Sequence, residues 1–413
     1  MENIKNVFIS HSGVCYRREL DSNKISSYFE SNGCMLVHDL DKANIIVLMT
    51  CGYKEEIANA IFNQIETLKQ YPAELIVLGC LPGIDPSEFQ KKFSGKWLST
   101  KDIDNIGSFF PEFKVKYTDL PDSNFLNETY VKDTASLYNL ENQPDNQFIG
   151  IIRVGKARMN HQDSDSKIPV IMCCRGCNWK CSYCGIYNAI GRVKSKSLKT
   201  VVDEYRKLLS AGYRDIRLTG DEVGNYGTDI QSNFGELLNT LRNVSRDSEI
   251  RWYINDIHPR YANEYRELLS KLVREGVLPE MQIMVQSGNN RILEQMNRGY
   301  AIESVSNCIK DFKSMNPFLK ITTHMIVGFP SETKKEFHET IDFVENSDID
   351  GAQFFAYSKR PNTPAYDRKD KLSNETIQQR MREIVQHFGK DNVDIITAHN
   401  FESLSNRFSK ATI

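Results

Sequence analysis

The chain of 413 residues lacks any long apolar segment. Its densest apolar run is the stretch IIVLM at residues 45–49, whereas a membrane-spanning helix needs about 20 such residues. The N-terminus MENIKNVFIS also lacks the basic stretch followed by an apolar one that marks a secretion signal. We therefore expect a cytoplasmic protein without a membrane partner.

A strong charge of either sign is also lacking. The 52 basic and 54 acidic residues give a formal net charge of −2. This balance provides no overall attraction to the phosphate backbone of a nucleic acid, although a local basic patch can exist within it. We find no repeat of fixed period and no low-complexity tract. Composition alone therefore neither requires nor excludes RNA as a partner.

Length and periodicity predict two α/β domains. Roughly the first ninety residues alternate apolar strands with helices, which is the pattern of a small doubly wound parallel sheet. Six further strand-helix units follow, and they predict a partial (βα)6 barrel, since a closed barrel has eight. The expected divisions are an N-terminal domain at 1–95, a linker with short structure at 96–148, the barrel at 149–390 and a tail at 391–413.

Cysteine is plentiful and unevenly placed. Five of the ten cysteines lie in CCRGCNWKCSYC, residues 173–184, directly after the first expected barrel strand. In a reducing compartment such clusters more often bind metal than form disulfides. Zinc is disfavoured, because three residues separate the two CxxC pairs where zinc ribbons have roughly 15–20. The alternative is that Cys177, Cys181 and Cys184 hold three irons of a [4Fe-4S] cluster and leave the fourth open.

Three more cysteines follow the strands of the N-terminal domain. Cys15, Cys51 and Cys80 each come within a few residues of an expected strand end. Because the carboxyl ends of parallel strands share one edge of a sheet, the three thiols can converge there. The alternative for each is a buried structural thiol, since free cysteine packs as a small hydrophobe. We expect that structural role for Cys173 and Cys174, which end an apolar strand.

The spacing of the barrel cysteines, with the aromatic Tyr183 before the last, resembles the radical SAM superfamily. Further motifs resemble one branch of it, the methylthiotransferases, from Cys15 to about Phe388. The chain departs from that pattern at Arg18, where Asn is usual, and at His324, where Asp is usual. The motifs are CYRRELDS (15–22), GRVKSK (191–196), LTGDEVGNYGTD (218–229), QSGNNRILEQMNRGY (286–300), IVGFPSET (326–333) and YSKRPNTPAY (357–366).

The resemblance implies two [4Fe-4S] clusters and S-adenosylmethionine (SAM) as cofactors. Cys177, Cys181 and Cys184 would hold the cluster that cleaves SAM to a 5′-deoxyadenosyl radical, and the three strand-end cysteines would hold a second one. The reaction implied is conversion of an unactivated C–H to C–S–CH3, with two SAM molecules per turnover. An electron donor of the flavodoxin or ferredoxin type is also implied.

The resemblance also assigns side chains to SAM and to the substrate. Tyr357 and Arg360 are candidates for the substrate, and the roles of His258 and His324 stay open. For SAM, the candidates are Thr219, Gly220 and Asp221 at the amino and carboxylate end, Gln286, Ser287 and Arg298 at the ribose and carboxylate, Val327 and Gly328 at the adenine, and Tyr183 in the cluster loop.

The substrate class follows less directly. Members of the family normally end in a small β-barrel that presents tRNA or a ribosomal protein, and the 25 residues after Phe388 are too few for five strands. We therefore expect a peptide, a protein side chain or a small metabolite, with adenosine in tRNA as the alternative. A cobalamin-type radical SAM methylase and a non-catalytic protein stabilised by metal are the other hypotheses.

Overall fold

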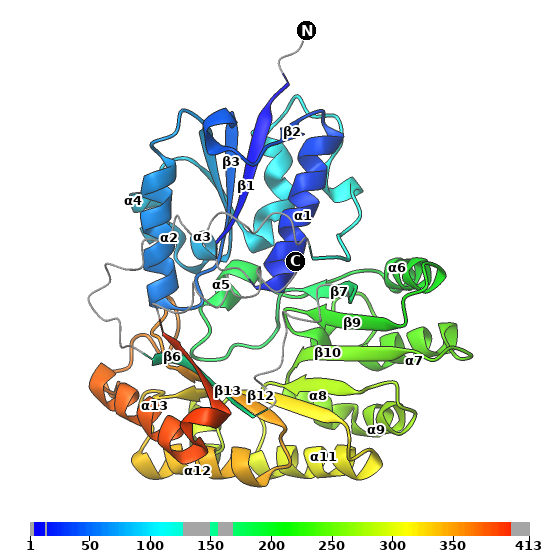
Figure 1. Ribbon diagram of the computed structural model, residues 1–413, viewed down its shortest axis with the longest axis vertical. Coiled ribbons are helices and arrows are strands. Elements are labelled where there is room, and N and C mark those ends of the chain that lie inside the picture. Colours follow the sequence, from blue (N-terminus) through cyan, green and yellow to red (C-terminus); the bar gives the residue numbers. More distant parts are fainter. Residues whose placement is uncertain (1–3, 13–14, 127–148, 156–167, 398–413) are drawn as a thin grey trace.

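The structure is a computed structural model that describes residues 4–12, 15–126, 149–155 and 168–397. They form two α/β domains, with the N-terminal domain above the barrel in Figure 1. Within these ranges no helix is both long and apolar enough to cross a membrane. The parts of the expected linker at 127–148 and of the expected tail at 398–413 lie outside the described residues.

The N-terminal domain is the predicted parallel sheet with helices on both faces. Long runs of Ile, Val and Leu form its central strands and are buried on both sides, as expected for such a sheet. The strands, in sheet order, are β2 (Met35–Leu36), β1 (Asn6–Ser12), β3 (Ile45–Thr50), β4 (Glu74–Gly79) and β5 (Lys96–Ser99). The helices are α1 (Tyr16–Ser31), α2 (Glu55–Leu68), α3 (Cys80–Ile84) and α4 (Pro86–Lys92).

This domain extends beyond residue 95, where we placed its end. β5 pairs in parallel with β4, and a 3-10 helix, Thr100–Phe109, follows it. Ile103 and Tyr117 are buried in the same core as Phe29 of α1. Residues 96–120 therefore belong to the domain rather than to a linker. These residues form 3-10 turns, which lack the 3.6-residue period by which helices are predicted from a sequence.

The barrel contains the six predicted strands, side by side, parallel and in chain order. They are β7 (Val170–Arg175), β9 (Asp215–Gly220), β10 (Arg251–Ile257), β11 (Glu280–Ile283), β12 (Lys320–Val327) and β13 (Gly351–Ala356). The helices pack on the outer face of this sheet over one apolar core. They are α6 (Leu198–Ser210), α7 (Phe234–Val244), α8 (Pro259–Glu264), α9 (Arg266–Arg274), α10 (Asn290–Gln295), α11 (Ile302–Met315), α12 (Lys334–Asn346) and α13 (Asn374–Phe388).

Three strands add to this sheet without having been predicted. β6 (Ile149–Gly155) lies antiparallel to β13, and β14 (Val393–Thr397) lies antiparallel to β6. β8 (Lys194–Ser195) pairs with β7 at the other edge. Residues 393–397 are therefore part of the barrel sheet and not of a tail. Over the described residues the sheet runs from β14 to β8 without closing.

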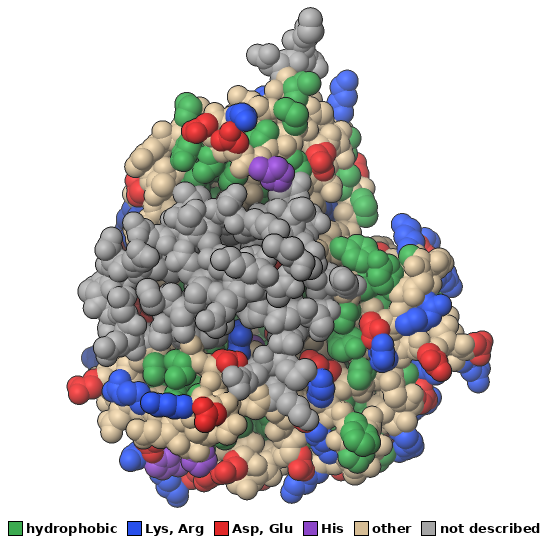
Figure 2. Space-filling view, in the orientation of Figure 1, with side chains coloured by type: hydrophobic (Ala, Val, Ile, Leu, Met, Phe, Trp, Pro, Cys, Tyr) green, Lys and Arg blue, Asp and Glu red, His purple; other side chains and the backbone are tan. Residues whose placement is uncertain are grey.

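The described surface carries charges of both signs. On the face shown in Figure 2, Lys and Arg side chains alternate with Asp and Glu side chains over the barrel. This agrees with the net charge of −2. A partner with many phosphates finds no extended basic stripe on the described part of this face.

The partly buried carboxylate of Asp122 connects the two domains. Its oxygens contact Lys24 of α1 at 2.8 Å, Lys196 at 3.0 Å and Arg175 at the end of β7 at 3.4 Å. Burial alone would raise the pKa of Asp122, but these three cations hold it well below the usual range. Asp122 therefore stays ionised, and it bridges the N-terminal domain and the barrel.

Replacing Asp122 with Asn should lower the free energy of unfolding by about 3 kcal/mol, because it leaves buried cations without their shared anion. The stabilisation is complete above about pH 4, the ordinary range of a carboxyl pKa, and is lost as the pH falls below it. Urea denaturation followed by circular dichroism measures both effects. Glu88→Gln, which breaks the exposed pair with Lys91, is the control and should change little. Equal effects of the two substitutions would contradict this role.

Candidate functional site

The loop after β7 carries three cysteines close together. We call this set the barrel triad: Cys177, Cys181 and Cys184. Ser182 fastens the loop to the barrel, since its amide donates to the carbonyl of Met296 at 3.0 Å and its hydroxyl donates to that of Gln295 at 2.7 Å. Gly176 before the triad has a φ of +77°, and a Cβ there would lie 2.1 Å from the carbonyl oxygen of Arg192. Only glycine fits this turn.

Each sulfur of the barrel triad faces N–H donors. The sulfur of Cys177 faces the Trp179 amide at 3.4 Å, and that of Cys181 faces the Arg298 guanidinium at 3.2 Å. The sulfur of Cys184 faces the amides of Ile186 and Tyr187. Burial nevertheless raises the pKa of Cys177 above its usual range and that of Cys184 to about 11. Such groups become thiolates beside a strong positive charge. Irons supply that charge, so the three thiols and their donors fit the ligand set of a [4Fe-4S] cluster.

The other three cysteines meet at the edge of the N-terminal sheet. We call them the strand-end triad: Cys15, Cys51 and Cys80. β1, β3 and β4 are in register up to Ser12, Thr50 and Gly79, so the three chains leave the sheet at one level. Burial, and to a smaller extent the nearby Cys15, raise the pKa of Cys51 to about 11. Burial also raises the pKa of Cys80, an effect that Arg18 opposes.

A single metal ion and a cluster require different arrangements of the thiols. Among the described residues, no group of three or more His, Cys, Asp or Glu side chains is arranged to hold one metal ion. In a [4Fe-4S] cluster each thiolate binds a different iron, so the sulfurs need not converge on one point.

The two triads share one small apolar cluster between the domains. Cys80 is buried in it with Ile84 and Ala189, and Cys177 packs against it. The helices that follow the two triads, α3 and α5 (Ile186–Ile190), lie against each other in Figure 1. A Cβ on Gly83 would lie 2.6 Å from the Cα of Ala189, so glycine permits this close approach. The packing therefore sets the two cysteine sites facing one another.

Asp221 joins the two triads through a second contact. Its carboxylate accepts from the Gly176 amide at 2.8 Å, one residue before the barrel triad, and from Arg18 at 3.0 Å, three residues after Cys15. Arg17 lies 3.6 Å from the same carboxylate. Burial alone would raise the pKa of Asp221, but Arg18 and Arg17 lower it. The Asp221 carboxylate is therefore ionised, and it contacts residues next to both triads.

The neighbours of Asp221 take part in the same contact. Tyr16 and Thr219 share a hydrogen bond of 2.6 Å between their hydroxyls, and Arg17 forms an ion pair with Asp256. A Cβ on Gly220 would lie 2.7 Å from the sulfur of Cys174, so this position needs glycine. Our candidates for SAM thus lie where the first turn of α1 contacts the end of β9. They are Thr219, Gly220 and Asp221.

Other candidate residues spread over the barrel mouth. Arg298 is buried and donates to Cys181 and to the carbonyl of Met284. The backbone of Gln286 bonds to that of β12, and the hydroxyl of Ser287 accepts from the Asn289 amide at 3.2 Å. Arg298 thus lies in contact with the barrel triad, whereas Ser287 is engaged in local structure.

The remaining candidates lie near the ends of β12 and β13. Val327 is buried in the barrel core, and Gly328, with a φ of +86°, lies against Ile377 of α13. Tyr183 and Tyr357 pack on one apolar cluster, which places the end of β13 beside the cysteine loop. Arg360 is buried and packs against Gly185, the residue after the barrel triad.

Sequence reasoning missed a group of side chains beside the barrel triad. His258 is only 1% exposed and stacks on Trp179 with ring centroids 4.3 Å apart. Its Nδ1 accepts from the Arg260 amide at 3.2 Å, and its Nε2 is buried without a partner among the described residues. Glu222 accepts from the His258 amide, and burial raises its pKa to about 8. A single sequence carries no signal for this grouping, which forms only when β9, β10 and the loop meet.

Cys173 and Cys174 stay apart from the barrel triad. Both are buried in the barrel core, and burial raises the pKa of each thiol. The sulfur of Cys174 lies 3.5 Å from the carbonyl oxygen of Glu222. Both thiols therefore serve packing in this structure.

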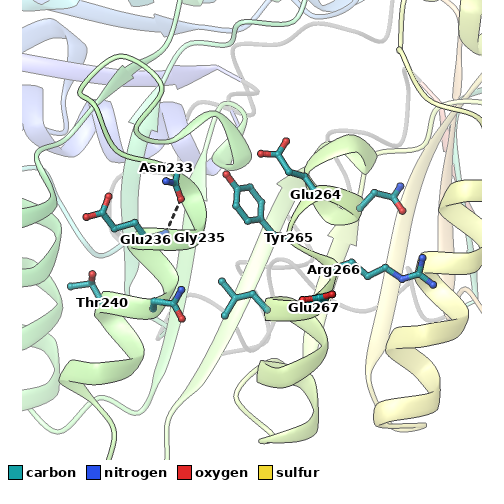
Figure 3. A pocket seen from close by; sticks show the side chains of 11 residues that line it. Asn233, Gly235, Glu236, Thr240, Glu264, Tyr265, Arg266 and Glu267 are labelled. Carbon is teal, nitrogen blue, oxygen red and sulfur yellow. Dashed lines mark hydrogen bonds between the residues drawn. The ribbon is translucent and has the colours of Figure 1, made fainter.

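An open hollow of about 760 Å³ lies on the outer side of the barrel (Figure 3). It is lined by α7 on one side and by α8 and α9 on the other. Asn233 caps α7 there, and its side chain accepts from the Glu236 amide at 2.9 Å. None of the cysteines and none of the candidate site residues line this hollow.

Comparison with known proteins separates the two halves of the chain. Residues 171–344 match the Radical SAM superfamily. Residues 6–98 match a family described as uncharacterized protein family UPF0004. Each triad thus lies in or beside a separately recognised segment, with Cys15, Cys51 and Cys80 in the first half and the barrel triad in the second.

Relatives of known name match along most of the chain. A tRNA-2-methylthio-N(6)-dimethylallyladenosine synthase of Clostridium botulinum is 28% identical over 397 residues, which cover 93% of this chain and 82% of the relative. The enzymes of that name from Clostridium tetani and Carboxydothermus hydrogenoformans are each 27% identical, over 94% and 90% of this chain and 82% and 81% of theirs. The match therefore includes both domains.

Solved structures confirm the fold. The cobalamin-binding radical SAM methyltransferase TsrM of Kitasatospora setae superposes with a TM-score of 0.57 at 13% identity, over 88% of this chain and 77% of that one. At this identity the likeness shows the arrangement of α/β domain and partial barrel alone. The motifs of both halves, the matched segments and the named relatives support the assignment of the chain to the radical SAM methylthiotransferase family, whose members are transferases that use SAM and [4Fe-4S] clusters.

Proposed function

We propose that this protein methylthiolates an adenosine in tRNA, replacing a C–H of the base with C–S–CH3. The observation that carries the proposal is the meeting of both cysteine triads at one interface between the domains. The relatives named for a tRNA adenosine product match over both domains. They favour the tRNA alternative over the peptide, protein or metabolite that we expected from the sequence, and they do not support that expectation.

In this proposal each triad holds one [4Fe-4S] cluster with one open iron. When bound, these groups and SAM supply a radical that removes hydrogen from carbon and a methylated sulfur that replaces it. The protein contributes placement, because a carbon radical must meet its sulfur before it reacts elsewhere. Arg298 supports the thiolate of Cys181 by donating to its sulfur.

The proposed SAM site is the barrel mouth beside the barrel triad. Thr219, Gly220 and Asp221 border its side near β9, and Gln286, Ser287 and Arg298 border its side near β11. Val327, Gly328 and Tyr183 would lie toward the adenine. Trp179 of the cysteine loop and His258, which stacks on it, add an aromatic face to this site. The Nε2 of His258 has no partner in the described part of the chain. A flavodoxin or ferredoxin remains our proposed electron donor.

Iron content tests the division of the cysteines. Anaerobically reconstituted protein should hold about eight irons per chain, since each cluster has four. A variant with Cys15, Cys51 and Cys80 all replaced by Ala should hold about four and still cleave SAM under reducing conditions. Cys308→Ala is the control, because Cys308 is buried in the barrel core. About four irons in the wild type would instead point to the cobalamin-type methylase.

The reaction itself is tested with tRNA that carries N6-dimethylallyladenosine. The holoenzyme, SAM and a reductant should increase the mass of that nucleoside by about 46 units, the sum of one sulfur and one CH2. Nucleoside mass spectrometry after digestion measures the gain, and Cys181→Ala should abolish it. A gain of about 14 units would mean methylation without sulfur. An unchanged tRNA would overturn the proposed substrate.

A further inference from the structure

The inner face of β12, β13 and β6 carries polar and aromatic side chains. On β13, Phe354 and Ala356 are buried against the outer helices, so the alternate residue Phe355 points to the inner side. His324 of β12 contacts the Phe355 ring with centroids 4.9 Å apart, and Arg153 of β6 lies in register beside this strand, opposite Gln353. Phe355, His324 and Arg153 thus form a row of half-buried side chains that faces the N-terminal domain.

The segment that follows Cys51 covers the end of this row. Lys54 donates to the carbonyl of Gly150 in β6 at 2.5 Å, and its ammonium lies 5.5 Å from the Phe355 ring. The Tyr53 ring meets Phe355 edge to face at 6.5 Å. The strand-end triad is therefore continuous in sequence with side chains that contact β6 and β13 of the barrel.

Arg360 lies between this segment and the barrel triad. It is 6% exposed, and its Nε is buried without a hydrogen-bond partner within the described residues. A Cβ on Gly185, the residue after Cys184, would lie 2.8 Å from the Cβ of Arg360. Glu55 and Glu56 act on its charge from beyond ion-pair distance. A buried guanidinium without a partner is costly, and a ligand that supplies an anion would relieve that cost.

Two further cations lie on this side of the interface. The Nε of Arg153 is buried without a partner in the described part of the chain. Burial lowers the pKa of Arg153 and of Arg360, and it lowers that of Lys54 to about 8, although Asp394, Glu55 and Glu56 oppose these shifts. The buried arginines beside Asp221 differ, because carboxylates raise the pKa of Arg17 and Arg18. In the described part of the chain, carboxylates thus compensate the positive charge beside Asp221 more fully than that of Arg153 and Arg360.

We infer that Arg360, Arg153 and the Tyr53–Lys54 segment bind the nucleotide to be modified, with the Arg360 guanidinium on a phosphate next to the target adenosine and the Tyr53 and Phe355 rings against its base. The inference rests on the proposed function and names the residues that would recognise its substrate. Arginine binds a phosphate through two parallel hydrogen bonds, and aromatic faces stack on unpaired bases. Residues of both triads flank this site.

The test is tRNA binding to the reconstituted holoenzyme at several salt concentrations, in parallel with the modification assay. Arg360→Gln should weaken binding about tenfold or more and reduce the slope of log K against log salt by about 1. Arg360→Lys should restore the slope, since it keeps the charge, but only part of the affinity. Phe355→Leu should weaken binding without changing the slope. Arg206→Gln, on the exposed side of α6, is the control.

Iron content separates recognition from folding. Arg360→Gln should keep the iron content of the wild type. If it loses iron, the guanidinium serves the cysteine site, and the inference is overturned. If the wild type modifies tRNA but Arg360→Gln leaves affinity and slope unchanged, this inference fails and the proposed function stands. If the wild type neither binds nor modifies tRNA, both fail.

Discussion

One carboxylate holds the two cysteine sites in place. Asp221 accepts from the backbone just before the barrel triad and from the arginines just after Cys15. A buried charge with good hydrogen-bond partners has a defined geometry, because each lost partner leaves an unpaired ion. The apolar contact of α3 with α5 adds a second constraint on the same two loops. The spacing of the triads therefore depends on contacts between the domains, and not on either domain alone.

This arrangement explains a departure from the family pattern. Arg18 stands where Asn is usual, and in this chain it is buried between Asp21 and Asp221. The two arginines of α1 thus neutralise the acidic side of the interface, near β9 and β10. On the opposite side, near β6 and β13, the Nε atoms of Arg153 and Arg360 have no hydrogen-bond partner among the described residues. The two sides of the interface thus differ in how far carboxylates pair with the buried arginines.

Much of the fold was predictable because the signals were local. The parallel sheet of the N-terminal domain and the six barrel strands were predicted, since segments such as the ELIVLG of β4 are short and largely apolar. β6 and β14 were missed because their partners lie far away in the chain. Likewise, the expected strand ends predicted that Cys15, Cys51 and Cys80 lie along one edge of the sheet, whereas the contacts of His258 and of Arg18 arise only from packing. Long-range pairing of polar groups leaves little trace in a single sequence.

The central claim is that both triads hold clusters that face each other across this interface. The most direct measurement is electron paramagnetic resonance of the fully loaded, chemically reduced protein, compared with the variant that lacks the strand-end cysteines. The account predicts a magnetic interaction between two reduced clusters in the wild type and a single unperturbed signal in the variant. Two independent signals from a protein that contains both clusters would contradict it.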